Sequence, residues 1–364
     1  MTPALVLMFG VLGGTVSGCG HGTQSPPKSG APEAEAVDPG WRRIADSPLS
    51  PRQGEMVVWT GSEMLVFGGY DGPPCPPNAD CLGGGRPLTD GAAYDPTTDA
   101  WRPMADLPVL PDDVHASWEV DQVVLRREGA PGERGGTVQA WAYDIDEDTW
   151  SRGRVTADAE PTPGQLDPRG RLAASLPPDP AWGPTFDRSV VWTGTEYFLT
   201  ALLENDPESP KHYRLARFRP GDEGWTDLGR TPVEFWNPVW YWFDARLVNP
   251  SQNLAMGATE QRVSGAWNPT SNTWEPVAQL SAEDPGDARC PLPEIGAAGD
   301  WLVTHNGILV SVIPSRVLPA PACDDVVEIH SALWTGSEIL TWGAVDHGWQ
   351  RNLAVGYRWQ PPSA

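Results

Sequence analysis

One short pattern recurs four times along this chain: an aromatic residue followed by a tryptophan seven positions later. The four copies end at Trp101, Trp150, Trp225 and Trp274. A second pattern, WTGSE or WTGTE followed by an apolar run, begins at Trp59, Trp192 and Trp334. Repeats of this length predict that the chain folds from copies of one supersecondary unit.

The first repeat contains four segments with the character of β-strands. EMVVW (55–59) and MLVF (64–67) are apolar and are joined by a glycine-containing turn. GAAYD (91–95) and WRPM (101–104) supply the third and fourth segments, with a DPTTDA turn between them. Four consecutive strands per repeat are the blade of a β-propeller.

Aligning the other repeats on the apolar run after the turn gives six units. The later units begin near His115, Arg188, Trp240, Glu294 and His330. The last unit ends before a fourth strand, and PGWRRIADSP (39–48) matches DAWRPMADLP (99–108). We therefore predict an all-β, six-bladed β-propeller of four-stranded antiparallel blades over residues 41–364. An N-terminal strand would close the last blade and leave no free sheet edge. Seven blades remain an alternative, because the interval from Trp150 to Trp225 is unusually long.

The N-terminus has the pattern of an export signal. Ala4 to Leu12 form an apolar run of the length found in signal peptides, and Val16-Ser17-Gly18-Cys19 resembles the lipobox of bacterial lipoproteins. The resemblance implies that residues 1–18 are a signal peptide. Cys19 would be acylated, for example with palmitate, and would hold the protein at the outer face of the cytoplasmic membrane. No Lys or Arg precedes Cys19, so an ordinary secretory signal or an apolar tail stays open.

Residues 19–40 are rich in Pro, Ser, Gly and Ala and lack an apolar period, which predicts a disordered tether. Besides Cys19, four cysteines remain. Two disulfides, Cys75 with Cys81 and Cys290 with Cys323, are the most economical of the three possible pairings. Such pairing agrees with an exported, extracellular protein.

The first repeat resembles the kelch-repeat and galactose-oxidase-like propellers through Gly68-Gly69, Tyr94 and Trp101. The next three repeats share only the aromatic-to-Trp spacing, and the fifth unit lacks it. No tyrosine here matches the family's radical-copper site, so the resemblance implies a fold and no catalytic residue. We expect no cofactor.

The resemblance also implies a ring of polar residues at one mouth of the central channel, because the residues before each innermost strand face the channel in related propellers. Here these positions hold the candidate ligand-binding residues Glu55, His115, Arg188, Glu294 and His330. Two acidic clusters with histidine, Asp112-Asp113-His115 and Asp324-Asp325-Glu328-His330, could hold a divalent ion or carry out acid–base work. Ordinary acidic loops are the alternative, and the presence of a metal stays open.

Tryptophan is abundant, with 19 residues. The tryptophans at 41, 101, 150, 225 and 274 follow the repeat, and we expect them to pack outer strands on the next blade while pairing their indole NH groups. Tryptophans outside the repeat phase are candidates for a sugar-stacking surface; these are Trp182, Trp236, Trp240, Trp242, Trp342 and Trp349.

Composition and motifs narrow the function classes. A net charge of −23 disfavours nucleic acid as a partner, and the sequence has no GxSxG, Walker, HExxH or Rossmann pattern. We expect a monomeric, lipid-anchored, non-enzymatic binding module for a protein or glycan. One alternative is a channel-mouth enzyme of the sugar epimerase, lyase or oxidoreductase type. The other is a scaffold in an envelope assembly, with an apolar patch near residues 236–242.

Overall fold

The computed structural model divides the chain into Met1–Asp38 and a compact unit, Pro39–Ala364. It describes residues 40–76, 85–112, 114–119, 122–127, 139–153, 176–204, 212–231, 239–250, 265–278, 292–304, 307–323 and 326–364. None of these residues lies in a helix long and apolar enough to cross a membrane.

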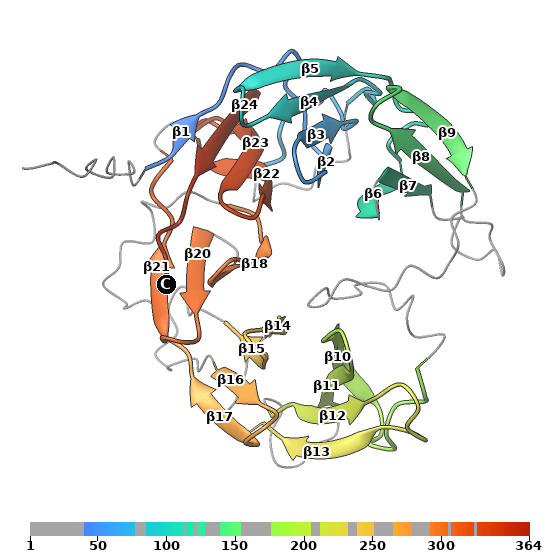
Figure 1. Cartoon of the computed structure of the whole chain (residues 1–364), viewed down its shortest axis with the longest axis vertical. Helices are drawn as coiled ribbons and strands as arrows, with labels where there is room; N and C mark the ends of the chain where they lie inside the picture. Colours follow the sequence, from blue (N-terminus) through green and yellow to red (C-terminus); the bar gives the residue numbers. More distant parts are fainter. Residues whose placement is uncertain are drawn as a thin grey trace, which may run out of the picture. The chain divides into compact units, whose positions relative to one another are not determined.

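The compact unit is an all-β, six-bladed propeller whose described strands form six four-stranded antiparallel sheets (Figure 1). The first three blades are β2 (Met56–Trp59), β3 (Met64–Phe67), β4 (Gly91–Asp95) and β5 (Ala100–Met104); β6 (Val114–Glu119), β7 (Gln122–Arg127), β8 (Gln139–Asp144) and β9 (Thr149–Gly153); and β10 (Thr185–Trp192), β11 (Tyr197–Leu203), β12 (Arg214–Phe218) and β13 (Thr226–Arg230). The last three blades are β14 (Tyr241–Phe243), β15 (Arg246–Asn249), β16 (Gly265–Asn268) and β17 (Thr273–Pro276); β18 (Gly296–Ala298), β19 (Trp301–Thr304), β20 (Ile308–Ser311) and β21 (Arg316–Pro319); and β22 (Glu328–Trp334), β23 (Ile339–Val345), β24 (Asn352–Trp359) and β1 (Arg42–Arg43). The prediction of six blades is confirmed.

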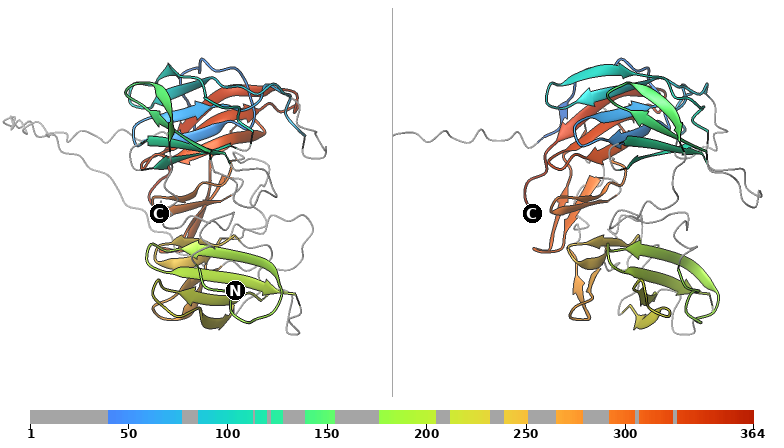
Figure 2. Two further views of the ribbon diagram at one scale, coloured as in Figure 1. Left: turned by 90° about the vertical axis from the view of Figure 1, so that its right-hand side faces the viewer. Right: turned by 45° about the vertical axis from the view of Figure 1, so that its right-hand side comes forward.

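The sixth blade combines the two ends of the compact unit. β1 pairs antiparallel with β24, with Arg42 opposite Arg358 and Arg43 opposite Tyr357. The blue β1 therefore lies beside the red β24 (Figure 1, Figure 2). The predicted closing strand is confirmed, and it removes the free edge that β24 would otherwise present.

The WTGSE pattern forms the same turn each time it occurs. In the first copy the Thr60 amide donates to the carbonyl of Glu63 (3.0 Å), and the Glu63 amide donates to Thr60 Oγ1 (2.9 Å). Gly61 has a φ of 99°, which favours glycine. Equivalent bonds recur at Thr193 and Thr335. The pattern is therefore the hairpin between the first two strands of a blade.

Among the described residues, apolar side chains pack between five of the six pairs of neighbouring blades. Separate core clusters join the first blade to the second, the third to the fourth, the fourth to the fifth, the fifth to the sixth, and the sixth to the first. Met64 and Tyr94 of the first blade, for example, pack with Leu340 and Trp342 of the sixth, all fully buried. No cluster among the described residues joins β6–β9 to β10–β13.

The connections between strands differ in length at the two ends of the sheets. At one end, which we call the turn end, the first strand of a blade turns into the second and the third into the fourth. These connections are short, as at 60–63, 96–99 and 335–338. At the opposite end, the loop end, the second strand leads to the third and each blade leads to the next. These connections include 68–90, 154–184 and 277–295.

Candidate functional site

Two of the predicted ring residues meet where the sixth blade joins the first. Glu55 directly precedes β2, and His330 lies in β22. The His330 Nδ1 atom is 3.7 Å from Glu55 Oε2, and the Ser331 hydroxyl donates to Glu55 Oε1 at 2.9 Å. The Glu55 side chain is 0% exposed and that of His330 10%. Glu55 Oε2 and His330 Nδ1 are buried without a hydrogen-bond partner. The pair is thus a desolvated carboxylate and imidazole held between two blades.

Gly343 makes the space for this pair. It lies at a register shift between Trp342 and Ala344 of β23 and has a φ of 74°. A Cβ atom at this position would lie 2.7 Å from Glu55 Oε1 and 3.1 Å from His330 Nδ1. A side chain larger than hydrogen therefore cannot fit without moving one member of the pair.

The other three predicted ring residues lie on the second, third and fifth blades. Arg188 forms a two-point ion pair with Asp179, at 2.6 and 2.8 Å, and the hydrogen bonds to Asp179 raise the pKa of the guanidinium. Burial raises the pKa of the Tyr241 hydroxyl, and the nearby carboxylate of Glu294 raises it further. His115 is half-buried in β6, opposite Arg126 of β7. The predicted ring of five ligand-binding residues therefore stays a prediction.

The two acidic clusters lie partly outside the described residues, at Asp113, Asp324 and Asp325. Asp112 accepts a hydrogen bond from the Tyr70 hydroxyl at 2.7 Å. The described residues contain no group of three or more His, Cys, Asp or Glu side chains that could hold a metal ion. The part of each cluster that the structure describes therefore does not form a metal site by itself.

The repeated tryptophans fix the segment that enters each blade. Trp101 Nε1 donates to the carbonyl of Ala45 at 2.9 Å, and Trp150 Nε1 donates to that of Ala105 at 3.2 Å. Trp41 and Trp225 make equivalent bonds, to Pro321 and Pro177. The predicted pairing of the indole NH groups is confirmed for these four tryptophans.

The same turns contain a second contact that the sequence did not reveal. Asp148 Oδ1 accepts from the Ala105 amide and from the Tyr143 hydroxyl, both at 2.7 Å. Asp99 makes the same two bonds, to the Ala45 amide at 3.0 Å and to the Tyr94 hydroxyl at 2.7 Å. In each case one alanine of the entering segment, Ala45 or Ala105, donates its NH to the aspartate and accepts at its carbonyl from the tryptophan. We call this arrangement the entry clamp.

The fifth blade keeps part of the clamp without the motif. The Ser315 hydroxyl accepts from the Ala278 amide at 2.9 Å, at the position where the first and second blades have Asp99 and Asp148. In the fourth blade Asn272 occupies this position and accepts from Trp267 Nε1 at 3.2 Å. The repeat is weak in the fifth unit because Val310 and Val317 lie opposite each other where the first blade has Tyr94 and Trp101.

One expectation for these tryptophans was wrong. Trp150 packs in the cluster shared with the first blade, and Trp101 in the cluster shared with the sixth. Each tryptophan thus packs on the preceding blade instead of the next one. The reason is geometric, because the entry segment that accepts the indole bond arrives from the preceding blade.

The tryptophans outside the repeat phase do not form one exposed surface among the described residues. Trp240 and Trp342 are 1% and 0% exposed, and Trp242 stacks on Phe198 with ring centres 5.6 Å apart. Trp182 donates its indole NH to Asp227 at 2.9 Å, and Trp349 is half-buried. Trp236 lies outside the described residues. The prediction of a stacking surface is wrong for Trp240 and Trp342, because both fill the core.

Both described cysteines, Cys75 and Cys323, are disulfide-bonded. Their predicted partners, Cys81 and Cys290, lie outside the described residues, as does Cys19. The pairing therefore stays a prediction.

The comparison with family models agrees with the fold. Residues 57–108, most of the first blade, match the kelch motif. None of the curated proteins matches the chain. Among solved structures, one described as the structure of YjhT is similar, with 13% identity, a TM-score of 0.32, and 88% of this chain and 85% of that chain covered.

Proposed function

We propose that this chain is an exported, lipid-anchored β-propeller that binds a protein or glycan at its loop end and catalyses no reaction. The observation that carries the proposal is the difference between the two ends of the sheets. Short hairpins form the turn end, whereas the long connections leave and re-enter the sheets at the loop end. Binding residues in proteins are concentrated on loops that a rigid scaffold positions.

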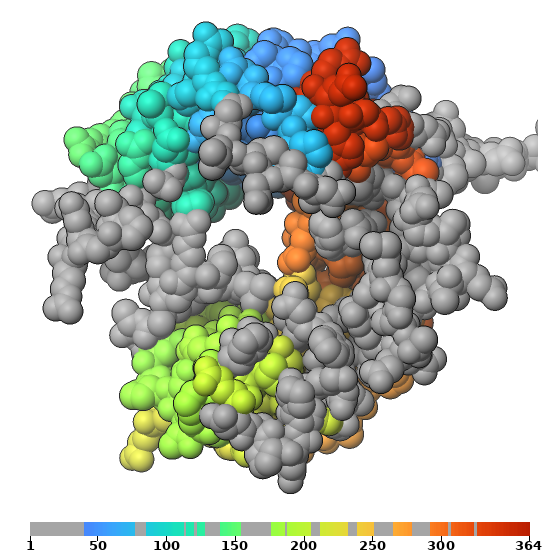
Figure 3. All heavy atoms as spheres, turned by 180° about the vertical axis from the view of Figure 1, so that it is seen from behind, coloured from blue at the N-terminus to red at the C-terminus, as the bar shows by residue number. Residues whose placement is uncertain are grey.

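Hydrogen bonds hold the described residues at the start and the end of the 68–90 connection, which lies at the loop end. The fully buried Arg52 binds both oxygens of Asp90 at 2.9 Å and the carbonyl of Gly68 at 3.0 Å. The Asn352 amide of the sixth blade donates to the carbonyl of Gly72 at 2.9 Å. Figure 3 shows red residues near the C-terminus against light-blue residues of the first blade. A base fixed in this way favours binding, because less entropy is lost when a ligand docks.

Export and anchoring rest on the N-terminal sequence and on cysteine chemistry. Val16-Ser17-Gly18-Cys19 supplies the lipobox, and the 19–40 tether would place the propeller away from the membrane. The disulfide state of Cys75 and Cys323 supports an oxidising compartment. A single acyl chain binds a membrane only weakly, so a diacylated Cys19 is the form that anchors stably.

The Glu55–His330 pair is the observation that favours the enzyme alternative, since a carboxylate beside an imidazole suits proton transfer. Both facing atoms are buried, however, and a substrate could not reach them without movement of β22 or β23. For the scaffold alternative, Val239 is the only exposed large apolar side chain among the described residues of 236–242. Binding at the loop end therefore has the stronger support.

A matched pair of exposed apolar residues tests the proposal. Leu110 lies at the loop end, between β5 and β6, and is 48% exposed, whereas Ile313 lies at the turn end, between β20 and β21, and is 59% exposed. We expect a photo-reactive benzoylphenylalanine at position 110, in the full chain within bacterial cells, to give a discrete cross-linked product. The same group at position 313 should give none. Cross-linking only at position 313, or at neither position, would contradict binding at the loop end.

A further inference from the structure

A concave surface lies at the turn end of the propeller, where the sixth blade meets the first. It is a groove of about 630 Å³ that is open to solvent. Three turns form it: 60–63 and 96–99 of the first blade, and 335–338 of the sixth. This volume falls within the range of small-molecule sites in proteins. We call it the seam groove.

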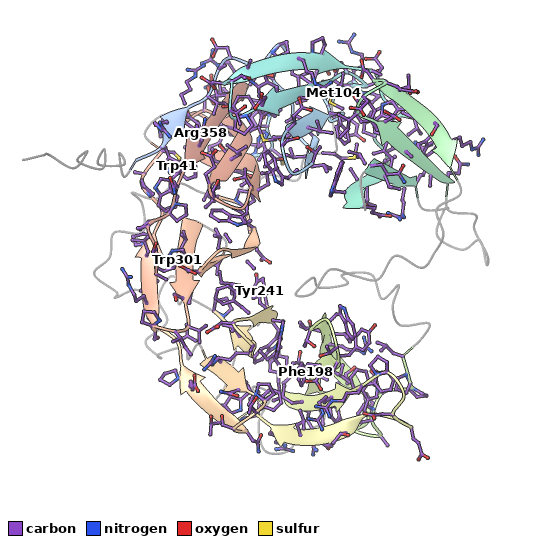
Figure 4. All side chains as sticks on the ribbon, viewed as in Figure 1. Trp41, Met104, Phe198, Tyr241, Trp301 and Arg358 are labelled. Carbon is purple, nitrogen blue, oxygen red and sulfur yellow. The ribbon has the colours of Figure 1, made fainter. Side chains whose placement is uncertain are left out.

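The walls of the seam groove are fixed across the two blades. Arg358 of β24 binds both carboxylate oxygens of Glu338, at 2.6 and 2.7 Å, and donates to the carbonyl of Pro96 at 2.8 Å. On the other side Glu63 is held in the same two-point way by Arg102, at 2.9 and 2.7 Å. Figure 4 labels Arg358, which lies on the sixth blade. The groove therefore exists before any ligand arrives, which lowers the entropy lost on binding.

The lining offers hydrogen-bond acceptors in fixed positions. A carboxylate has about four acceptor sites, and the arginine partners use two on Glu63 and two on Glu338. The side chain of Glu63 is 18% exposed and that of Glu338 12%, and we expect the remaining acceptor sites to face the groove. The hydroxyls of Ser62 and Ser337 lie on opposite walls, and both residues are exposed. Such a lining matches a ligand that carries several hydroxyl groups.

Charge and the single aromatic residue narrow the ligand class further. The three carboxylates Glu63, Asp95 and Glu338 exceed by one the two guanidinium groups that bind them, Arg102 and Arg358, and the whole chain carries −23. An anionic ligand would be repelled by this field. Trp59 also lines the groove and is half-buried, and an indole presents an apolar face beside a polar edge. An apolar patch beside dense hydrogen-bonding groups is complementary to a pyranose ring.

We propose that the seam groove binds a neutral saccharide. This site is separate from the loop end, and the two proposals can fail independently. The saccharide would lie across the seam between the blades, with its hydroxyls on the Glu63 and Glu338 carboxylates and one ring face toward Trp59.

The test uses the full chain and ligand-observed saturation-transfer NMR. The probes are maltose, cellobiose, lactose and chitobiose, with glucuronic acid as the anionic comparison. We expect at least one neutral disaccharide to bind and glucuronic acid to give no signal. The Ser337→Trp and Ser62→Trp variants, which place an indole in the groove from opposite walls, should each weaken that binding at least tenfold.

The chain supplies a matched control in the third copy of the same turn. Thr195 occupies the position of Ser62 and Ser337 in the WTGTE turn of the third blade, is exposed, and does not line the groove. Thr195→Trp should leave saccharide binding unchanged, and all three variants should keep the thermal midpoint of the parent chain. Absence of binding by every neutral disaccharide would overturn the proposal. So would equal binding of glucuronic acid, or undiminished binding by the folded Ser337→Trp and Ser62→Trp variants.

Discussion

Replacing Gly343 by alanine is expected to lower the free energy of unfolding by about 3 kcal/mol. Two costs add at this position. Gly343 has a φ of 74°, and a non-glycine residue in this left-handed region costs about 1–2 kcal/mol. The new Cβ would also lie 2.7 Å from Glu55 Oε1 and 3.1 Å from His330 Nδ1, and displacing a buried polar group costs about 1–3 kcal/mol. For a domain of this size such a loss lowers the thermal midpoint by roughly 4–5 °C.

Gly336 provides the matched control for this prediction. It also has a positive φ, of 104°, but a Cβ atom there would meet nothing within 4 Å. Gly336→Ala should therefore lose only the backbone part, about 1–2 kcal/mol. Chemical denaturation of the two variants gives the comparison. Equal losses would mean that the close approach of Gly343 to the Glu55–His330 pair contributes nothing to stability.

Replacing Asp148 by alanine is expected to cost about 2–3 kcal/mol. The carboxylate accepts from the Tyr143 hydroxyl and from the Ala105 amide, and Tyr143 is 0% exposed. Its loss leaves a buried hydroxyl without its acceptor, at about 1–3 kcal/mol, and alanine tolerates the φ of 51° poorly. Asp148→Asn keeps an acceptor oxygen and should lose less than about 1 kcal/mol. The fourth blade already uses Asn272 at this position.

The entry clamp also predicts how the difference in unfolding free energy between the parent chain and Asp148→Ala changes with pH. The hydrogen bond from Tyr143 and the one from the Ala105 amide hold the pKa of Asp148 below its ordinary value. That contribution to stability is present above a pH of about 4 and is lost as the pH falls. Burial, followed by the bond to Asp148, raises the pKa of Tyr143 to about 12. The stability that comes from the raised pKa of Tyr143 is present below pH ~10 and is lost as the pH rises toward 12.

Unfolding free energies of the parent chain and Asp148→Ala, measured from pH 3 to 11, test the direction of both pH effects. The gap between the two proteins should be widest near neutral pH and should narrow toward both extremes. A gap that stays constant across this range would show that the side chain of Asp148 stabilises the blade without its charge.

The sequence predicted the fold because the propeller repeats its hairpin turns and its outer-strand tryptophans. Trp59, Trp192 and Trp334 mark three of the six hairpins, and the match between residues 39–48 and 99–108 was enough to predict β1. The fifth blade was harder to predict, since Val310 and Val317 stand where the first blade has Tyr94 and Trp101. Valine is common in strands of every kind, so these two positions give no repeat signal of their own.

The candidate sites could be predicted only in part. Glu55 and His330 were chosen from their places before innermost strands, but their contact depends on the closing of the sixth blade against the first. The need for Gly343 arises from a register shift in β23, which no sequence period marks. The seam groove likewise joins turns 60–63 and 335–338, which lie at opposite ends of the sequence. Such sites depend on packing between blades instead of on local pattern.

The central claim is that a lipid on Cys19 displays this propeller outside the cytoplasmic membrane. The direct measurement is radiolabelled palmitate incorporation and membrane fractionation of the full chain in bacterial cells, compared with Cys19→Ser. We predict that the parent chain is labelled, sediments with membranes and is digested by protease added to spheroplasts. Cys19→Ser should be unlabelled and should leave the membrane fraction. A parent chain that is unlabelled, or that fractionates like Cys19→Ser, would contradict the account.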